Sequence, residues 1–208
     1  MNSLVVISRP RWFSGRSILR IIGGSLRGRP LAMPSGLAIR PTGARVREAL
    51  FDILAHGETP LPAGANVVDC FAGTGALGFE ALSRGATRVT FLDTRRSARR
   101  LVRTNAIRLG VTEQVEILNS DALRPMRPPM PCQLALLDPP YGANLASRAL
   151  ASMSSKGWLS DGTVAALELS TKDEFAAPAG FYVLTSRVYG STRLIILEWW
   201  ADNPTNKD

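Results

Sequence analysis

The chain has 208 residues, of which 45% are hydrophobic and 20% are charged, a balance typical of one globular domain with room for a small appendage. No apolar run approaches the roughly 18 residues that a membrane-spanning helix needs, which argues against a membrane protein. The two cysteines, Cys70 and Cys132, lack metal-ligand spacing and are too few for a disulfide framework. We therefore expect a cytoplasmic protein that binds no metal.

The net charge of +8 originates in the N-terminal quarter of the chain. Residues 1–50 hold nine arginines and one acidic residue, whereas the remaining residues hold 16 basic and 16 acidic side chains. Arginine contacts phosphate through two parallel hydrogen bonds, so this segment favours a nucleic-acid partner. The alternative interpretation is a basic tail that only keeps the protein soluble.

The N-terminal region is expected to begin with a disordered extension, because residues 1–17 show no periodicity. Two short strands are predicted at 18–22 and 29–33, since the glycines between them supply turn residues. Thr42 can cap a following helix, whose apolar positions recur at helical spacing. We interpret residues 18–60 as a basic, RNA-binding hairpin and helix.

The chain from residue 61 to residue 202 is expected to form the main domain, in which strand-like and helix-like segments alternate. Strands are predicted at 66–70, 88–92, 115–118, 134–137 and 163–169, and helices at 76–84, 95–109 and 144–154. Two last strand-like runs, 181–188 and 192–200, predict an antiparallel hairpin at the sheet edge. This pattern is typical of an α/β, Rossmann-like fold with a mostly parallel seven-stranded sheet and helices on both faces.

A glycine-rich turn from Asp69 to Gly75 follows the first strand of this domain and opens a helix. In that position the backbone can approach a ligand at the carboxyl end of the strand. Asp93 ends the next strand, where a carboxylate can hydrogen-bond ribose hydroxyls. Asp121 and Ala122 follow the third strand and could meet an adenine edge, although Asp121 could instead close a turn or cap a helix.

The glycines at positions 73, 75 and 78 also fit the fingerprint of NAD-binding enzymes. Asp69 argues against NAD, because a carboxylate within the turn would repel a pyrophosphate. The only histidine, His56, precedes the first strand and is poorly placed for hydride chemistry. S-adenosylmethionine fits better, since it has ribose, adenine and an ammonium but no phosphate. Gly78 is better explained by packing between helix and strand.

The most informative motif is Asp138-Pro139-Pro140-Tyr141, at the end of an apolar run. Proline has no N–H, so this backbone offers carbonyl oxygens without amide hydrogens. Asp138 adds a carboxylate acceptor and Tyr141 adds a flat ring. Acceptors beside a stacking face suit a planar group with an exocyclic amine, such as a nucleobase; the alternative is an ordinary strand-ending turn.

The turn Asp69-x-Phe71-x-Gly73-x-Gly75 together with Asp138-Pro139-Pro140-Tyr141 resembles class I amino-methyltransferases of the N6-adenine and N2-guanine type. The arginine-rich segments within 20–29 and 40–48, and the run 71–86, more specifically resemble the RsmD family. That family methylates N2 of one guanine in 16S ribosomal RNA of the small subunit. The resemblance covers about residues 18–200 and implies S-adenosylmethionine as cofactor, with no metal.

The resemblance and the motifs imply three groups of site residues. The catalytic residues would be Asp138, Pro139, Pro140 and Tyr141. The residues that bind the cofactor would be Asp69, Phe71, Gly73, Gly75, Asp93, Asp121, Ala122 and Thr42. The residues that bind RNA would be Arg20, Arg27, Arg29, Arg40, Arg45 and Arg47, although Arg45 and Arg47 could instead pair with Glu48 or Asp52 on a solvated helix face.

The expected partner is 16S ribosomal RNA or the assembling small subunit, with no obligate protein partner and S-adenosylhomocysteine as product. Two alternatives remain open. An N6-adenine DNA methyltransferase shares the acidic Pro-Pro-aromatic motif, but this chain has little room for a target-recognition domain. A non-catalytic, RNA-binding assembly protein is disfavoured by the intact motif at 138–141.

Overall fold

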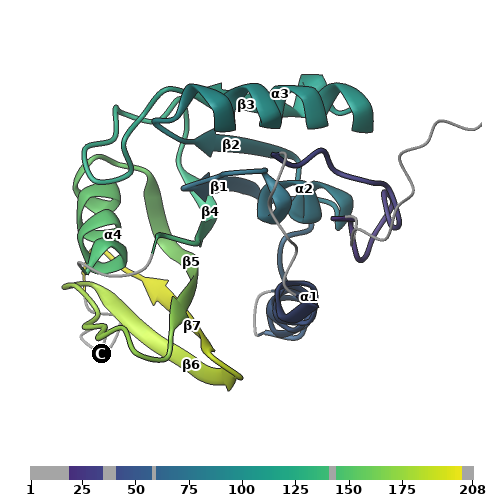
Figure 1. Ribbon diagram of the computed structural model, residues 1–208. Helices are drawn as coiled ribbons and strands as arrows, with labels where there is room; N and C mark the ends of the chain where they lie inside the picture. The colour runs from purple at the N-terminus through teal and green to yellow at the C-terminus, as the bar shows by residue number, and fades with distance from the viewer. Residues whose placement is uncertain (1–18, 35–40, 58–59, 141–143, 203–208) are drawn as a thin grey trace, which may run out of the picture.

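A seven-stranded sheet forms the centre of the protein (Figure 1). The computed structural model describes residues 19–34, 41–57, 60–140 and 144–202. The strands are β1 (Asn66–Cys70), β2 (Arg88–Leu92), β3 (Val115–Leu118), β4 (Cys132–Leu137), β5 (Leu159–Ser170), β6 (Phe181–Tyr189) and β7 (Thr192–Trp199). The helices are α1 (Pro41–Ala55), α2 (Ala76–Ser83), α3 (Arg96–Leu109) and α4 (Leu145–Ser155), with a short 3-10 helix at Thr112–Gln114.

The strand order is β3-β2-β1-β4-β5-β7-β6. Strands β1 to β5 are parallel, and β7 lies antiparallel between β5 and β6. The predicted fold class and its C-terminal hairpin are therefore confirmed. The chain winds outward in one direction from β1 and in the other from β4, so the topology reverses between these two neighbours. In open α/β sheets, ligands bind at the carboxyl ends of the strands at this point.

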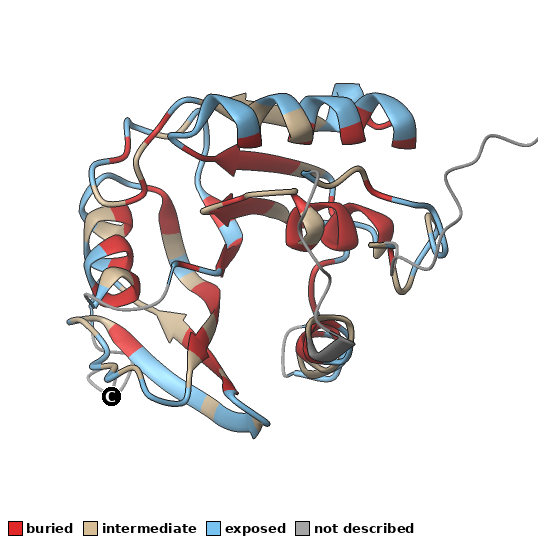
Figure 2. Ribbon diagram, viewed as in Figure 1, coloured by how far each residue is buried: buried red, intermediate tan, exposed pale blue. Residues whose placement is uncertain are grey.

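Apolar side chains on both faces of the sheet explain the long apolar runs of the central strands. Helices α1, α2 and α3 share a core with one face, and α4 shares a core with the other. In Figure 2, α3 is buried on its sheet side and exposed on its outer side, whereas α2 is buried along most of its length. Helices α2 and α3 connect β1 to β2 and β2 to β3, which lie on one side of β1 in the sheet. Helix α4 connects β4 to β5, which lie on the other side. Because such crossovers are right-handed, α4 packs on the opposite face of the sheet.

Helix α1 begins at Pro41, one residue before the predicted cap Thr42. Proline is favoured in the first turn of a helix, where its missing N–H costs nothing. Val46, Leu50 and Leu54 are buried against the sheet, as their spacing predicted. The side chain of Thr42 lies outside the described residues.

The N-terminal segment, residues 19–34, turns back on itself with a single antiparallel bridge between Arg20 and Pro30. The backbone N–H of Leu31 donates to the carbonyl of Leu19 at 2.8 Å, and that of Ile21 donates to Arg29 at 3.0 Å. The hairpin path is as predicted, but full strands do not form. Pro30 cannot donate a ladder hydrogen bond, which limits the pairing.

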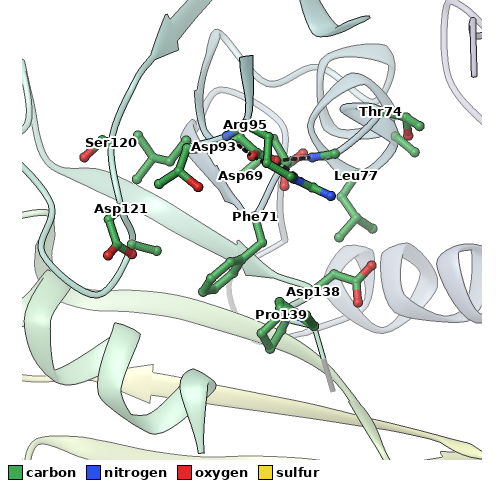
Figure 3. Close-up of a pocket in the computed structure, with 17 residues that line it drawn as sticks. Asp69, Phe71, Thr74, Leu77, Asp93, Arg95, Ser120, Asp121, Asp138 and Pro139 are labelled. Carbon is green, nitrogen blue, oxygen red and sulfur yellow. Dashed lines mark hydrogen bonds and ion pairs between the residues drawn. The ribbon is translucent and has the colours of Figure 1, made fainter. Parts of the chain in front are cut away.

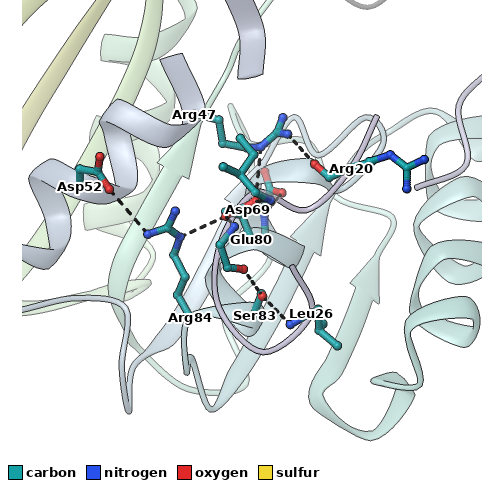
Figure 4. A network of polar contacts seen from close by, with 11 residues as sticks. Arg20, Leu26, Arg47, Asp52, Asp69, Glu80, Ser83 and Arg84 are labelled. Carbon is teal, nitrogen blue, oxygen red and sulfur yellow. Dashed lines mark hydrogen bonds and ion pairs between the residues drawn. The ribbon is translucent and has the colours of Figure 1, made fainter. Parts of the chain in front are cut away.

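Glu80, on α2, is the centre of a polar network that fastens this segment to the core (Figure 4). Its carboxylate is fully buried and accepts hydrogen bonds from the backbone N–H groups of Ile22 at 2.8 Å and Gly23 at 2.7 Å. Arg84 lies 3.1 Å from the same carboxylate and Arg47 lies 3.6 Å from it. The charge of Glu80 is therefore neutralised by two arginines, Arg47 of α1 and Arg84 directly after α2.

The prediction that Arg47 binds RNA needs correction. Its side chain is only 8% exposed, and it faces Glu80 rather than solvent. One guanidinium N–H also donates to the backbone carbonyl of Arg20 at 2.8 Å. Arg47 therefore fixes the N-terminal segment to α1 and α2, and a phosphate has no access to it.

Candidate active site

A cavity of about 640 Å³ opens where the topology of the sheet reverses (Figure 3). Such a volume is within the range of small-molecule and cofactor sites. Nine of the predicted catalytic and cofactor residues line it: Asp69, Phe71, Gly73, Asp93, Asp121, Ala122, Asp138, Pro139 and Pro140. These residues follow four different strands, so the sheet brings together motifs that are far apart in the sequence.

The glycine-rich turn is built from residues with positive φ. Gly73 has φ 55° and Gly75 has φ 79°, a conformation that glycine adopts without steric cost. Phe71, a bulky side chain, has φ 62°, which is a rare and strained conformation. Figure 3 shows its ring projecting between Asp121 and Asp138. Strain at this position is consistent with a ligand-binding role for the turn.

Two of the glycines support the turn by their lack of a side chain. A Cβ on Gly75 would lie 2.6 Å from the ring of Phe79, and one on Gly78 would lie 2.4 Å from the ring of Phe91. The interpretation of Gly78 as a packing residue is therefore confirmed. Gly75, predicted to contact the cofactor, does not line the cavity and instead opens α2.

Asp69 lies at the floor of the cavity, almost completely buried. Its carboxylate accepts a hydrogen bond from the backbone N–H of Gly78 at 2.8 Å, which holds the start of α2 against β1. Burial raises the pKa of Asp69 well above its ordinary value, and the nearby charges of Asp138 and Asp93 add to this effect. A cationic ligand in the cavity would favour the ionised form.

Asp93 is already fully hydrogen-bonded at the rim of the cavity. Its carboxylate accepts three hydrogen bonds from the backbone and guanidinium of Arg95, at 2.8 to 3.1 Å, and one from the backbone N–H of Gly73 at 3.0 Å. Burial works against ionisation, but these hydrogen bonds outweigh it and lower the pKa of Asp93. The Arg95 side chain is 66% exposed and free to rotate away, which would release one edge of the carboxylate.

We expect Asp93→Ala to weaken S-adenosylmethionine binding by about 10- to 100-fold, because a hydrogen bond to a charged group contributes roughly 1.5–3 kcal/mol. Arg95→Gln keeps the carboxylate and removes its competing donors, so binding should hold or tighten. Calorimetric titration of both variants measures the difference. Equal affinity for the two variants would contradict a ribose-binding role for Asp93.

Asp121 and Ala122 line the side of the cavity beyond β3. One carboxylate oxygen of Asp121 accepts from the backbone N–H of Leu123 at 2.9 Å, so this residue does close a turn as well as face the cavity. Ser120 also lines the cavity; only its place next to Asp121 could have indicated this from the sequence.

Asp138 follows β4 directly and faces the open cavity (Figure 3). Solvent reaches the side chain, yet the protein atoms crowded around it raise the pKa of Asp138 to about 6. Pro139 is buried and Pro140 is exposed at the cavity wall. Tyr141 and Arg40 lie outside the described residues.

Glu168, on β5, is a residue that the sequence did not single out. Leu137 of β4 pairs with Leu167 of β5, so Asp138 and Glu168 occupy the next positions along adjacent strands. Burial and, second, the charge of Asp138 raise the pKa of Glu168 to about 7, although the charge of Arg47 opposes the shift. Asp138, at the cavity wall, therefore has a second carboxylate with a raised pKa beside it on the adjacent strand.

The remaining predicted arginines lie on the surface. Arg20, Arg27, Arg29 and Arg45 are all exposed. The Arg20 guanidinium donates to the carbonyl of Gly28 at 2.8 Å, and that of Arg29 donates to the carbonyl of Arg108 at 2.7 Å. The two alternative partners of Arg45, Glu48 and Asp52, form no ion pair with it.

The described part of the chain has no group of three or more His, Cys, Asp or Glu residues placed to hold a metal ion. None of its helices combines the length and the apolar character needed to cross a membrane.

The sheet order, the reversal point and the cavity beside the Asp-Pro-Pro motif define the class I methyltransferase fold. Residues 19–198 match the family model described as Conserved hypothetical protein 95. The chain is 32% identical to Ribosomal RNA small subunit methyltransferase D of Escherichia coli over 94% of this chain and 97% of that protein. It is 34% identical to the protein of the same name from Haemophilus influenzae, over 83% of this chain and 89% of that one.

Among solved structures, the Escherichia coli protein yhhF superposes with a TM-score of 0.78 at 33% identity, covering 89% of this chain and all of that one. The chain therefore belongs to the RsmD family, the family of the Conserved hypothetical protein 95 model. It is an S-adenosylmethionine-dependent methyltransferase, as the sequence predicted. Membership of this family argues against two of the alternative functions, an NAD oxidoreductase and an N6-adenine DNA methyltransferase.

Proposed function

We propose that this protein transfers a methyl group from S-adenosylmethionine to the exocyclic N2 amine of a guanine in 16S ribosomal RNA. The observation that carries the proposal is the position of Asp138 and Pro139 at the cavity wall, across from the glycine-rich turn. Family membership supports the substrate, since the Escherichia coli relative is named a small-subunit ribosomal RNA methyltransferase. With ribosomal RNA as substrate, the protein would act in the cytoplasm.

The cavity residues suit the parts of S-adenosylmethionine. Asp93 would hold the ribose hydroxyls, Asp121 and Ala122 would flank the adenine, and Asp69 would face the amino-acid end. Phe71 would limit the space between these parts. The cofactor supplies a methyl group that its sulfonium already activates, so the protein contributes mainly alignment.

Asp138 and Pro139 would orient the amine that receives the methyl group. The nitrogen lone pair of guanine N2 is delocalised into the ring, which makes it a weak nucleophile. An ionised Asp138 carboxylate and the Pro139 carbonyl can accept its two N–H bonds, which favours a pyramidal nitrogen with the lone pair directed at the methyl group. Asp138 would take up the proton after the new N–C bond has formed.

The base must leave its stack to reach the cavity. Tyr141 would stack on the extruded guanine, with a contribution of about 1–3 kcal/mol by comparison with other base–aromatic pairs. The exposed arginines of the N-terminal segment and α1, together with Arg40, would hold the surrounding phosphates; the exposed ones are Arg20, Arg27, Arg29 and Arg45. Residues 18–60 thus serve the RNA, and residues 61–202 serve the cofactor and the reaction.

We expect the rate of transfer to rise with pH across the range from about 6 to about 7. Burial raises the pKa of Asp138 to about 6 and that of its neighbour Glu168 to about 7. Below about pH 6 Asp138 carries a proton, so it is a weaker acceptor for its amine hydrogen and cannot take up the proton that the reaction releases. Glu168→Gln removes the neighbouring charge, so the rise of the transfer rate near pH 7 should disappear and the remaining rise should move to lower pH. If the profiles of kcat/KM against pH coincided for the wild type and Glu168→Gln, this would contradict an influence of Glu168 on the ionisation of Asp138.

Transfer of labelled methyl from S-adenosylmethionine to small ribosomal subunits, free 16S ribosomal RNA and DNA tests the proposal. We expect label in one of the two ribosomal substrates and none in DNA. Comparison of the two ribosomal substrates shows whether the protein acts on free RNA or on an assembled particle. Binding of the cofactor without transfer to any RNA would favour a non-catalytic role in ribosome assembly.

A further inference from the structure

Helix α3 carries a concentration of positive charge that the N-terminal arginines do not include. Between Asp93 and Glu113 the chain has six arginines and no acidic residue. Five of these arginines are exposed, and four of the five lie on α3 itself: Arg96, Arg100, Arg103 and Arg108. Figure 2 shows the outer side of α3 as exposed along the helix, whereas its inner side is buried against the sheet. The balanced total charge of residues 51–208 therefore hides a strongly basic surface.

The described part of the protein does not neutralise this charge. Its ion pairs involve Arg47, Arg84 and Arg95, and none reaches the four exposed arginines of α3. Arg96 and Arg100 are four residues apart on one helix, a spacing at which like charges repel. The first turn of α3 has basic and no acidic residues, the reverse of what the helix dipole favours.

The fold does not require these arginines. The inner side of α3 is held by apolar burial of Ala98, Val102, Ala106 and Leu109. A row of like charges that opposes helix stability, without compensation in the structure, is typical of a functional surface rather than of a folding determinant. The partner that would relieve the repulsion is a polyanion.

The α3 surface is continuous with both the N-terminal segment and the cavity. At its C-terminal end, Arg29 donates to the carbonyl of Arg108 at 2.7 Å. On the buried side of α3, the Asn105 side chain accepts a hydrogen bond from the backbone N–H of Ala32 at 2.7 Å and donates one to its carbonyl at 3.2 Å. It also donates to the carbonyl of Thr74, in the glycine-rich turn, at 3.0 Å. At its N-terminal end, Arg95 lines the cavity.

We propose that the exposed side of α3, formed by Arg96, Arg100, Arg103 and Arg108, is a second RNA-binding surface that holds the phosphate backbone beside the methylated base. Arg96 and Arg108 are about 18 Å apart along the helix, from a rise of about 1.5 Å per residue, so the surface spans several nucleotides. Its connection to the N-terminal segment makes one basic track that ends at the cavity. The α3 surface depends on the proposed function in one respect only, the identity of the RNA that it binds.

The test compares two double variants that remove the same charge. Arg100→Gln with Arg103→Gln alters the α3 surface, and Arg148→Gln with Arg187→Gln alters two exposed arginines on α4 and β6. Binding to a 16S ribosomal RNA transcript is measured from low to high salt. We expect the α3 variant to bind on the order of tenfold more weakly and to lose about 1.5 from its salt slope, since each phosphate contact contributes about 0.7–0.9. The control should match the wild type.

Arg100→Lys with Arg103→Lys should recover much of the binding, because a point charge still attracts phosphate. The proposal would be overturned if the α3 variant and the control bound RNA equally well. It would also be overturned if the α3 variant lost binding to anionic vesicles but not to RNA. Cofactor affinity, measured in parallel, confirms that each variant is folded. If the wild type bound RNA through α3 but methylated no ribosomal substrate, this surface would stand and the proposed reaction would fail.

Discussion

Asp138→Ala should abolish methyl transfer and leave S-adenosylmethionine binding almost unchanged. We expect the single-turnover rate to fall by about 10²- to 10⁴-fold, the range for loss of a positioned proton acceptor. The side chain lies at the cavity wall, where the proposed guanine would enter, while the residues that would hold ribose and adenine follow β2 and β3. Cofactor affinity therefore depends little on Asp138.

Asp138→Asn is the matched control, because the amide keeps the size of the side chain and one acceptor oxygen, while an NH2 donor replaces the other oxygen and the charge is lost. It should transfer faster than the alanine variant but far more slowly than the wild type. A large loss of cofactor affinity in either variant would show that Asp138 binds the cofactor and does not orient the amine. Rapid-quench measurements with saturating cofactor separate the two roles.

Glu80→Ala should lower the free energy of unfolding by about 3–5 kcal/mol, because it leaves a buried charge without its partner. Glu80 is fully buried and faces Arg47, whose side chain is only 8% exposed. The backbone N–H groups of Ile22 and Gly23 would lose their acceptors as well. For a chain of this length the change corresponds to a drop in Tm of roughly 10 °C.

Glu48→Ala is the control for this prediction, since Glu48 is an exposed carboxylate on the same helix as Arg47. Its effect should stay within about 0.5 kcal/mol. Urea unfolding followed by tryptophan fluorescence measures both variants. A loss below about 1 kcal/mol for Glu80→Ala would mean that the network does not fasten the N-terminal segment to the core.

The sheet was predictable because its central strands are short apolar runs bounded by turn residues. The predicted limits of β1, β2 and β3 agree with the structure, whereas β5 begins earlier, at Leu159. The N-terminal hairpin was overestimated as two strands, since pairing there depends on contacts with Ser83 and Glu80 on α2 that lie far away in the sequence.

The cavity was predictable from motifs, but its electrostatic partners were not. Asp93 and its role could be proposed from position alone, and its partner Arg95 is only two residues away. Glu168, by contrast, acts on Asp138 from an adjacent strand. Arg47 shows the limit most clearly. We predicted that it binds RNA or lies on a solvated helix face, although the buried residues Leu50 and Leu54 follow it by three and seven positions, a helical spacing that could have indicated burial. Its partner Glu80 is brought to it only by the fold.

The most direct test of the central claim is mass spectrometry of the nucleosides from 16S ribosomal RNA after reaction with this protein and S-adenosylmethionine. Our account predicts N2-methylguanosine at one site, formed by the wild type and absent with Asp138→Ala. Methylation of an adenine, or of a guanine at a ring nitrogen, would contradict the proposed orientation of the amine by Asp138 and Pro139.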